Sequence, residues 1–490
     1  MHKGILLILD GYGEAEARAG NAVTNAKTPT LNKIKSKGYA LLKTSGEAVG
    51  LFKGEMGGSE VGHTTIGAGR IIPSTALEIK QDIKNKNFEN NPKILKILNE
   101  LKKNKSDLHL FGLMSDKNIH SDIKHCIKLI EMAKEKANNI YIHFVTDGRD
   151  CGERDSVKYL KQLNKAIKGV ENCHILSVSG RFYAMDRENY LERTKTALNS
   201  MFFKENPIKE SEIEKYIKNQ HNNKVNDQYI VPAYVESKTY KQIGKNDCIF
   251  FFNFREDRLR QIVKACEQFK CKLVTMANVG GVSAISIYQN KNVEHTLSEH
   301  LSNLNLKQIK ISETTKYAHV TFFLNGGREE PFTGEDRVHV PTIETNNYAL
   351  TPKMQAKEIT KQVKLAIKKG YDAIIVNYSN PDMIGHTGDY LATVKALKFL
   401  DKCVKQVLSS AKKNNYFTLL TADHGNSEEM INKNGEPHTA HSLNDVFCAV
   451  VNKNVKLKAN GELKDVAPTF LELMDVAPNP YFNGSSLIIK

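Results

Sequence analysis

The sequence contains no apolar run long enough to cross a membrane. Its 490 residues include no stretch of 18 consecutive apolar residues, and the first apolar run, Ile5 to Leu9, ends at Asp10. A membrane-spanning helix needs about 20 such residues, and the early run is too short for the core of a signal peptide. We therefore expect no membrane partner.

Cysteine is scarce and dispersed. Eight cysteines occur, and the closest pair, Cys266 and Cys271, does not form a C-x-x-C motif. This spacing argues against a disulfide framework and against a structural zinc site. A reducing compartment suits such a chain, and we expect it in the cytoplasm.

Dense basic blocks are also missing, although the formal net charge is +15. Nucleic-acid-binding proteins usually cluster basic residues with aromatics on one face, whereas the 58 lysines are spread along the chain. The 12 arginines differ, because eight of them lie between Arg149 and Arg260 and none follows Arg337. A guanidinium is a planar bidentate donor, so this cluster predicts a small anionic ligand and no nucleic-acid partner.

Internal repeats and low-complexity segments are absent, and the length suggests two to four domains. Apolar runs of five to eight residues alternate with helix-period segments, which predicts an α/β fold with mainly parallel sheets. A stripe of apolar residues predicts a helix over 391–411. A second helix is expected over 351–370, where Thr351-Pro352 gives a start signal and Gly370 a stop signal.

The predicted strands end in two kinds of residue. Toward both ends of the chain they lead into acids and imidazoles: 4–9 into Asp10, 373–378 into Asp382, and 416–421 into Asp423 and His424. In the middle they lead into arginine: 141–146 into Arg149, 174–178 into Arg181, and 248–252 into Arg255. The simplest interpretation is one α/β domain, residues 1–73 and 293–490, interrupted by a second at 74–292. Open α/β sheets place ligands at the carboxyl ends of their strands.

The strands that end in acids bring together the donors of a metal site. The candidate ligands are Asp10, Asp382, His386, Asp423, His424, His438 and His441. Mixed carboxylate and imidazole ligands suit Mn²⁺ or Zn²⁺. Two such clusters at strand ends suggest a two-metal site, which clamps a phosphoryl group and activates its attacker.

Ser59 is the candidate nucleophile. It follows Gly57-Gly58, and glycines there allow a tight turn with close backbone approach. Its hydroxyl could cap the helix that follows. Alternatively, a metal beside it could activate the hydroxyl, which is a weak nucleophile without such help.

The strands that end in arginine predict a binding site for an acidic substrate. The candidates are Arg149, Arg181, Arg187, Arg255 and Arg258. Bidentate guanidinium contacts fix a carboxylate or phosphate in orientation as well as in position. Asp150 and His120 lie near this cluster in the sequence, and either could shuttle a proton.

These motifs, in their order along the chain, resemble those of the cofactor-independent phosphoglycerate mutases. The matching segments are 57–63, 147–150, 179–187, 251–258, 313–336, 380–388, 422–426 and 438–442. The resemblance covers nearly the whole chain, from Gly4 to beyond Pro468. It implies an alkaline-phosphatase-like metal domain interrupted by a second α/β domain that binds substrate. It also implies an enzyme that interconverts 3-phosphoglycerate and 2-phosphoglycerate in glycolysis and gluconeogenesis.

The resemblance implies a role for each candidate residue. Ser59 becomes phosphorylated, and two Mn²⁺ ions are held by two sets of side chains. One set is Asp10, Ser59, Asp423 and His424, and the other is Asp382, His386 and His441, with His441 preferred to His438. The implied substrate contacts are His120, Arg149, Asp150, Arg181, Arg187, Arg255, Arg258 and Lys316.

The resemblance further implies that no 2,3-bisphosphoglycerate is needed, because the phosphate returns from Ser59 to the same glycerate. The small-molecule substrate would bind between the domains, and we expect a monomer. The alternative is a metal-dependent phosphatase or a sugar-phosphate mutase built on the same catalytic domain. The arginine-rich insert favours a small phosphate that carries a carboxylate.

Overall fold

A computed structural model describes residues 1–289, 292–432 and 434–489. The chain divides into two compact units, each of which is described by itself. Unit 1 comprises Met1–Ser74 and Lys291–Lys490, and unit 2 comprises Thr75–Asn290. Within the described residues, no helix is both long and apolar enough to span a membrane.

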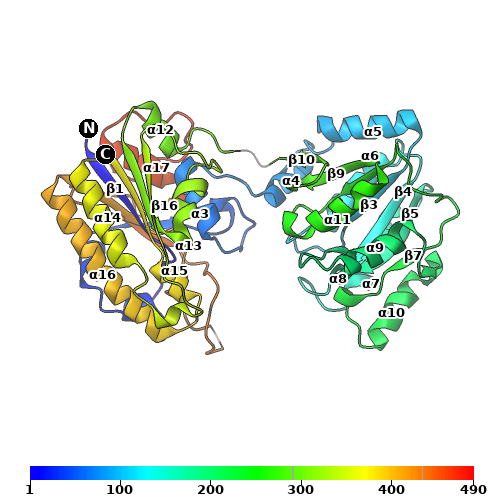
Figure 1. Ribbon diagram of the computed structural model, residues 1–490, viewed down its shortest axis with the longest axis horizontal. Helices are drawn as coiled ribbons and strands as arrows, with labels where there is room; N and C mark the ends of the chain where they lie inside the picture. The colour runs from blue at the N-terminus through cyan, green and yellow to red at the C-terminus, as the bar shows by residue number, and fades with distance from the viewer. Residues whose placement is uncertain (290–291, 433, 490) are drawn as a thin grey trace. The chain divides into compact units, whose positions relative to one another are not determined.

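Unit 1 is built on an eight-stranded sheet (Figure 1). The strands, in spatial order, are β12 (Glu335–Val340), β11 (Gln308–Glu313), β13 (Ala373–Tyr378), β1 (Lys3–Leu9), β14 (Tyr416–Thr421), β15 (Val446–Val451), β2 (Ala40–Lys43) and β16 (Asn460–Glu462). The first five strands are parallel, and β15 pairs antiparallel with both of its neighbours. The central strands β1, β13 and β14 are almost wholly buried, because helices cover both faces of the sheet.

The helices of unit 1 form a layer on each face of its sheet (Figure 1). Helices α14 (Ala356–Lys369) and α16 (Tyr390–Lys413) pack side by side on one face, and α3 (Ser59–Ala68), α12 (Leu297–Asn303) and α17 (Val466–Met474) lie on the other. The shorter helices are α1 (Ala22–Asn25), α2 (Pro29–Lys35), α13 (Thr314–Ala318) and α15 (Asn380–Gly385). Apolar residues on the inner stripe of α16 are buried, as its sequence predicts.

Strand register aligns the residues that matter at one end of this sheet. Leu9 of β1 pairs with Tyr378 of β13, and Ile8 pairs with Thr421 of β14. The residues that follow these three strands therefore lie at the same edge of the sheet. They are Asp10, Asp382 on helix α15, and the Asp423-His424 pair. Hydrophobic packing of the sheet thus holds three acidic side chains in a fixed frame.

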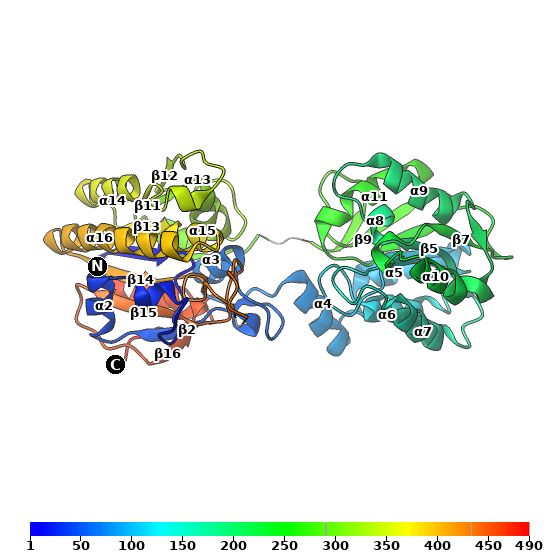
Figure 2. The ribbon, with the colours of Figure 1, turned by 90° about the horizontal axis from the view of Figure 1, so that it is seen from below.

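Unit 2 has its own eight-stranded sheet, also covered on both faces (Figure 2). Its spatial order is β10 (Ile285–Tyr288), β9 (Lys272–Ala277), β8 (Cys248–Phe251), β3 (Leu108–Leu113), β4 (Ile140–Thr146), β5 (Cys173–Gly180), β7 (Ala233–Val235) and β6 (Pro207–Ile208). Among the described pairings of this second sheet, the pair β5–β7 alone is antiparallel.

The helices of unit 2 bury two apolar clusters against its sheet. One face is covered by α5 (Pro92–Asn104), α6 (Ile123–Ala133), α7 (Ser156–Ile167) and α10 (Ile213–Asn222). The other face carries α8 (Arg181–Ala184), α9 (Leu191–Phe202) and α11 (Arg260–Cys266), and α4 (Thr75–Lys84) opens the unit. The expectation of an α/β fold with mainly parallel sheets is confirmed.

The helix expected over 351–370 begins later than predicted, at Ala356. Residues between Thr351 and Ala356 form turns, and Met354 has a left-handed φ of 40°. The Asn380 side chain donates to the carbonyl oxygens of Pro352 and Lys353, at 3.1 and 3.0 Å. These carbonyls are therefore engaged by a tertiary contact, and the local start signal is overridden.

Candidate active site

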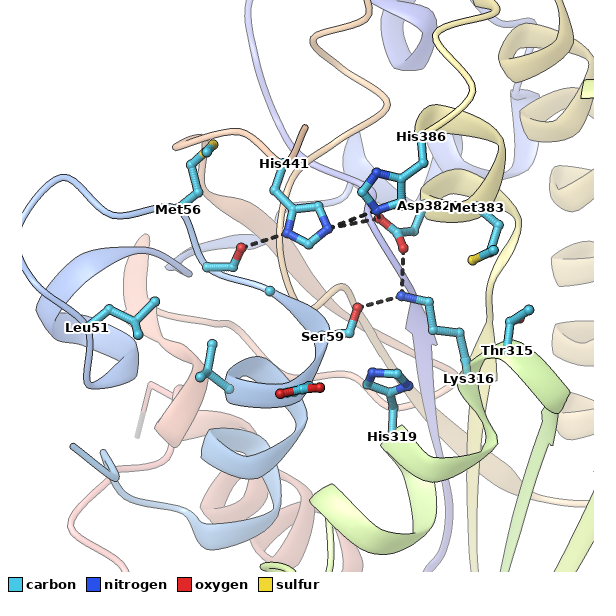
Figure 3. Close-up of a pocket in the computed structure, with 14 residues that line it drawn as sticks. Leu51, Met56, Ser59, Thr315, Lys316, His319, Asp382, Met383, His386 and His441 are labelled. Atoms are coloured by element: carbon cyan, nitrogen blue, oxygen red, sulfur yellow. Dashed lines mark hydrogen bonds and ion pairs between the residues drawn. The ribbon is translucent and has the colours of Figure 1, made fainter. Parts of the chain in front are cut away.

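Ser59 is the first residue of α3, and its side chain is almost fully buried. Its Oγ lies 2.5 Å from Lys316 Nζ (Figure 3). The same oxygen lies 3.1 Å from Asp10 Oδ1 and 2.9 Å from His424 Nε2. The residue in the N-cap position is Gly58, and no side chain caps this helix. The capping role considered for Ser59 is therefore wrong, because its hydroxyl points into a cluster of charged groups instead.

Three buried carboxylates meet beside this serine. Lys316, on α13, forms ion pairs with Asp10 Oδ1 at 2.7 Å and with Asp382 Oδ2 at 2.6 Å. Burial raises the pKa of each of these carboxyls, but Lys316 and the neighbouring histidines together outweigh burial and hold both pKa values well below their ordinary range. Asp423, the third carboxylate, is also fully buried, and it accepts a hydrogen bond from the Gly11 backbone N–H at 3.2 Å.

His386 and His441 approach Asp382 from two different loops. Their Nε2 atoms lie 3.2 and 3.4 Å from Asp382 Oδ1 and 3.1 Å from one another (Figure 3). Each Nδ1 faces a backbone carbonyl: that of Thr439 at 2.7 Å for His386, and that of Gly57 at 2.8 Å for His441. A carbonyl partner fixes the proton on Nδ1 and leaves Nε2 as the free donor atom for a metal.

His424 occupies the centre of the cluster. Its ring stacks on that of His441 with centroids 3.9 Å apart, and its Nε2 lies 3.4 Å from Asp423 Oδ2. Burial lowers the pKa of this imidazole, but the neighbouring carboxylates of Asp423 and Asp10 outweigh burial and raise the pKa to about 9. The surroundings of His424 therefore favour a positive charge.

A cavity of about 500 Å³ opens onto these groups. Its wall includes Ser59, Lys316, His319, Asp382, His386 and His441 (Figure 3). Its size suits a small molecule. Ser59 and Lys316 therefore face a cavity and are not sealed in the core.

Unit 2 brings together the substrate contacts predicted for it. Arg181 is buried and pairs through Nη1 with Asp147 Oδ1 and Asp150 Oδ2, both at 2.5 Å. His120 Nε2 lies 3.6 Å from Asp150 Oδ2. Burial, helped by the positive charge of Arg181, lowers the pKa of His120 to about 4. This imidazole is therefore neutral at physiological pH.

The other arginines of unit 2 form the more open side of this cluster. Arg187 Nη1 and Arg255 Nε pair with the two oxygens of Asp257, at 2.9 and 3.1 Å. Arg258 donates to the Met185 carbonyl oxygen at 3.1 Å, and its pKa is lowered by burial and by the charges of Arg181, Arg187 and Arg149. The cluster therefore carries an excess of positive charge, which suits an anion.

Comparison with known proteins decides the family. A model of the metalloenzyme superfamily matches residues 2–478. A 2,3-bisphosphoglycerate-independent phosphoglycerate mutase of Methanosarcina acetivorans is 40% identical over 506 residues, covering 99% of this chain and 97% of that protein. Another from Listeria welshimeri is 40% identical, with 99% of each chain covered. The chain belongs to the 2,3-bisphosphoglycerate-independent phosphoglycerate mutase family.

A solved structure of the same activity supports this assignment. A phosphoglycerate mutase of Leishmania mexicana, determined at low cobalt concentration, superposes with a TM-score of 0.65 and 27% sequence identity. The match covers 100% of this chain and 98% of that one. The predicted resemblance to this mutase family is confirmed, and the chain is an isomerase of a metalloenzyme family.

The residues present fit the metal dependence of this mutase family. Two groups of side chains could each hold an ion: Asp382, His424 and His441 in one group, and Asp10, His63 and Asp423 in the other. Lys316 pairs with two of the three buried carboxylates, Asp10 and Asp382, so the cluster carries negative charge that a divalent cation would neutralise. Asp423 Oδ2 is buried and makes no hydrogen bond among the described residues, and its neighbours at 3.3 and 3.4 Å are the imidazole nitrogens of His63 and His424. This oxygen is therefore available as a metal ligand.

The geometry of the two groups differs from the ligand sets implied by the sequence. His424 lies here with Asp382 and His441, although it was expected with Asp10 and Asp423. Its Nε2 is nevertheless only 3.5 Å from Asp10 Oδ1, so it borders both groups. His438 belongs to neither group, and its Nδ1 lies 2.9 Å from the Glu429 carbonyl oxygen.

Two residues that support this mutase site were not predicted from the sequence. His63, one helical turn after Ser59, places Nδ1 2.8 Å from the Ser59 carbonyl oxygen and 3.3 Å from Asp423 Oδ2. Asn377 on β13 donates to Asp10 Oδ2 at 2.7 Å and contacts His63 Nε2 at 3.0 Å. The i, i+4 spacing of Ser59 and His63 on one helix face was the available signal for His63. For Asn377 the sole indication in the sequence was a polar residue within an apolar strand.

Proposed function

We propose that this chain interconverts 3-phosphoglycerate and 2-phosphoglycerate through a phosphoserine on Ser59, without 2,3-bisphosphoglycerate. The observation that carries the proposal is the serine itself. A buried hydroxyl at the start of α3 faces a cavity and contacts a lysine, a carboxylate and an imidazole at once. The family relationship supplies the substrate.

The surroundings of Ser59 suit a phosphoryl group. Backbone N–H groups at the start of α3 and the ammonium of Lys316 present positive charge to the serine oxygen. In the first step Ser59 Oγ gives up its proton and forms a bond to phosphorus as the ester P–O bond breaks, and the leaving oxygen takes up a proton. In the second step the other glycerate hydroxyl loses a proton and bonds to phosphorus as the Oγ–P bond breaks, and Ser59 Oγ takes a proton back, which regenerates the serine.

The proposed ligands are Asp10, Ser59, Asp423 and His424 for one Mn²⁺, and Asp382, His386 and His441 for the other. Bound divalent ions would neutralise charge on the phosphoryl oxygens and lower the pKa of the serine hydroxyl. Asn377 and His63 orient Asp10 and the backbone of Ser59 for this arrangement.

The proposed substrate contacts in unit 2 are His120, Arg149, Asp150, Arg181, Arg187, Arg255 and Arg258, and in unit 1 Lys316. The guanidinium groups would hold the glycerate by its carboxylate. Asp150, which pairs with Arg181 and lies near His120, would exchange a proton with a glycerate hydroxyl. Unit 1 thus acts as the metal and phosphoryl-transfer domain, and unit 2 as the substrate domain.

A coupled assay tests the proposal. Conversion of 3-phosphoglycerate to 2-phosphoglycerate is measured after chelation, with and without added Mn²⁺ and with no bisphosphoglycerate. We expect activity only with the metal, and no release of inorganic phosphate. Steady phosphate release without isomerisation would instead identify a phosphatase, and turnover of a hexose phosphate would identify a sugar-phosphate mutase.

We propose further that the enzyme acts as a monomer in the cytoplasm. All eight cysteines are free, as suits a reducing compartment. Sedimentation at micromolar concentration and fractionation of the source cells test these two points separately.

A further inference from the structure

Glu428 is a fully buried carboxylate that has no part in the proposed reaction. Its Oε2 accepts hydrogen bonds from the backbone N–H groups of Gly13, at 3.0 Å, and Asn426, at 2.8 Å. Its Oε1 accepts a short hydrogen bond from Ser442 Oγ and another from Asn444 Nδ2 at 3.0 Å. All four donors are neutral, and they come from three separate segments of the chain.

Two of these segments carry the histidines that stack at the centre of the site. His424 precedes Gly425, and His441 precedes Ser442. Gly425 and Ser442 are joined by an isolated antiparallel bridge, and the Ser442 N–H donates to the Gly425 carbonyl at 3.0 Å. Glu428 fastens both sides of that bridge, through Asn426 on one side and Ser442 on the other.

The backbone is shaped around this carboxylate. A Cβ added at Gly13 would overlap the Glu428 carboxyl group, and a Cβ added at Gly425 would overlap Glu428 Oε1 and Ser442 Oγ. Gly13 follows Asp10 by three residues, so the same carboxylate also anchors the loop after β1. Glycine is required at both positions because the chain approaches Glu428 so closely.

We propose that Glu428 is a positioning residue that sets the separation of His424 and His441, and thereby allows both metal ions to bind. The inference rests on the proposed function, since it assigns Glu428 a task at the proposed metal site. One histidine comes from each proposed ligand set, so a change in their spacing would affect both ions. Removal of a group that orients metal ligands without itself binding the metal typically lowers metal affinity about 10–100-fold.

The pattern of donors predicts which substitution rescues the site. Backbone N–H groups cannot reverse their direction, whereas the Ser442 hydroxyl can rotate and the Asn444 amide can flip, with the loss of its 3.3 Å hydrogen bond to Glu429 Oε2. In Glu428→Gln the side-chain oxygen can therefore serve Gly13 and Asn426 while its NH₂ group donates to Ser442 and Asn444. Glu428→Ala leaves two buried N–H groups without an acceptor, and Glu428→Asp is one methylene too short to reach both pairs.

The test is calorimetric titration of chelator-treated protein with Mn²⁺, with urea unfolding measured on the same samples. Asp401→Ala is the matched control, because Asp401 is a buried carboxylate of unit 1 that accepts from the Thr30 and Leu31 N–H groups at 3.2 and 2.9 Å. We expect Glu428→Ala to weaken Mn²⁺ binding about 10–100-fold and Glu428→Gln to stay close to wild type. Asp401→Ala should lower stability without changing the Mn²⁺ affinity.

Wild-type Mn²⁺ affinity in Glu428→Ala, or an equal loss in Asp401→Ala, would overturn the proposal for Glu428. If Glu428→Ala does not fold, Glu428→Asp takes its place with the same expectation. A wild-type chain that binds no Mn²⁺ would overturn the proposed metal chemistry itself. If the wild-type chain binds Mn²⁺ and Glu428→Ala binds it with the same affinity, the proposed metal chemistry is retained and only the positioning role is rejected.

Discussion

Ser59 contacts Asp10, His424 and Lys316 through a single oxygen atom. Ser59→Ala removes that atom and little else, so the fold should survive and isomerisation should fall below about a hundredth of wild type. Steady-state assays of Ser59→Ala and of the control Ser409→Ala, which changes a solvent-exposed position on α16, check this. Turnover of Ser59→Ala near the wild-type rate would show that the reaction does not pass through this serine.

Arg255 and Arg258 lie in one short segment with Arg260, which offers an internal control. Arg260 is exposed and pairs with Glu256 four residues before it, whereas Arg258 is half-buried and reaches the Met185 carbonyl. Lysine keeps the charge but not the bidentate fork, so Arg255→Lys or Arg258→Lys should lower kcat/KM about 10–100-fold, the equivalent of about one charged hydrogen bond. Arg260→Lys should leave it unchanged. Equal kinetics for all three variants would make these arginines ordinary surface residues.

Residues at strand ends were predictable, and residues that act through tertiary contacts were not. Asp10 and Asp423 follow apolar runs whose parallel pairing fixes where they emerge. Glu428 lies in a loop after the Asp423-His424 pair, and its four donors come from residues up to 415 positions away. No local pattern encodes that convergence, and the same holds for Asn377.

At the scale of elements, the turn before α3 shows why glycine precedes the serine. A Cβ at Gly57 would collide with the Thr44 carbonyl oxygen, while a Cβ at Gly58 would meet only the edge of His441 at 3.4 Å. Gly57→Ala should therefore displace the start of α3 and the His441 contact with the Gly57 carbonyl. Gly58, with an extended φ of −160°, should tolerate alanine.

The two glycine variants differ by one residue, which makes them a direct comparison. We expect Gly57→Ala to cost about 1–3 kcal/mol of stability, as overpacking does, and to lower activity strongly. Gly58→Ala should stay close to wild type in both respects. Thermal unfolding and kcat/KM measured together check the pair, and similar behaviour of the two variants would contradict the packing argument.

Elements themselves were predictable where periodicity is strong. The central strands of both sheets and the long helix α16 lie where apolar runs and the helical stripe place them. The late start of α14 was not predictable from the local sequence. The Asn380 side chain, from another element, hydrogen-bonds to the carbonyls of Pro352 and Lys353, which the Thr-Pro start signal places inside the helix. The antiparallel place of β15 between β14 and β2 likewise depends on pairing across the chain.

At the scale of the whole molecule, buried histidines link stability to pH. In unit 2, His109 Nδ1 lies 3.0 Å from His143 Nε2, and His143 Nδ1 lies 2.9 Å from Ser177 Oγ. Burial lowers the pKa of His109 to about 3 and lowers the pKa of His143 well below its ordinary value. Both rings are therefore neutral in the folded chain and remain so in mild acid.

The sign of the effect follows from proton counts. Below about pH 6.5 the unfolded chain binds protons at these rings and the folded chain does not. The contribution of these two rings to stability is therefore full above that pH and is lost as the pH drops toward 3. From pH 7 to pH 5, His109 alone should cost about 2 kcal/mol of unfolding free energy. This loss is separate from any effect of acid on metal binding, because both rings lie in unit 2.

Urea unfolding at pH 7 and pH 5, in the presence of a chelator, measures this loss. The chain has no tryptophan, so circular dichroism is the suitable probe. His109→Asn removes one titrating ring and should flatten the pH dependence by about 2 kcal/mol, whatever it does to stability at pH 7. His2→Asn, at an exposed position of unit 1, should keep the wild-type slope. An unchanged slope in His109→Asn would mean that His109 already binds its proton in the folded chain at pH 5, which its burial against Tyr141, Phe202 and Tyr240 opposes.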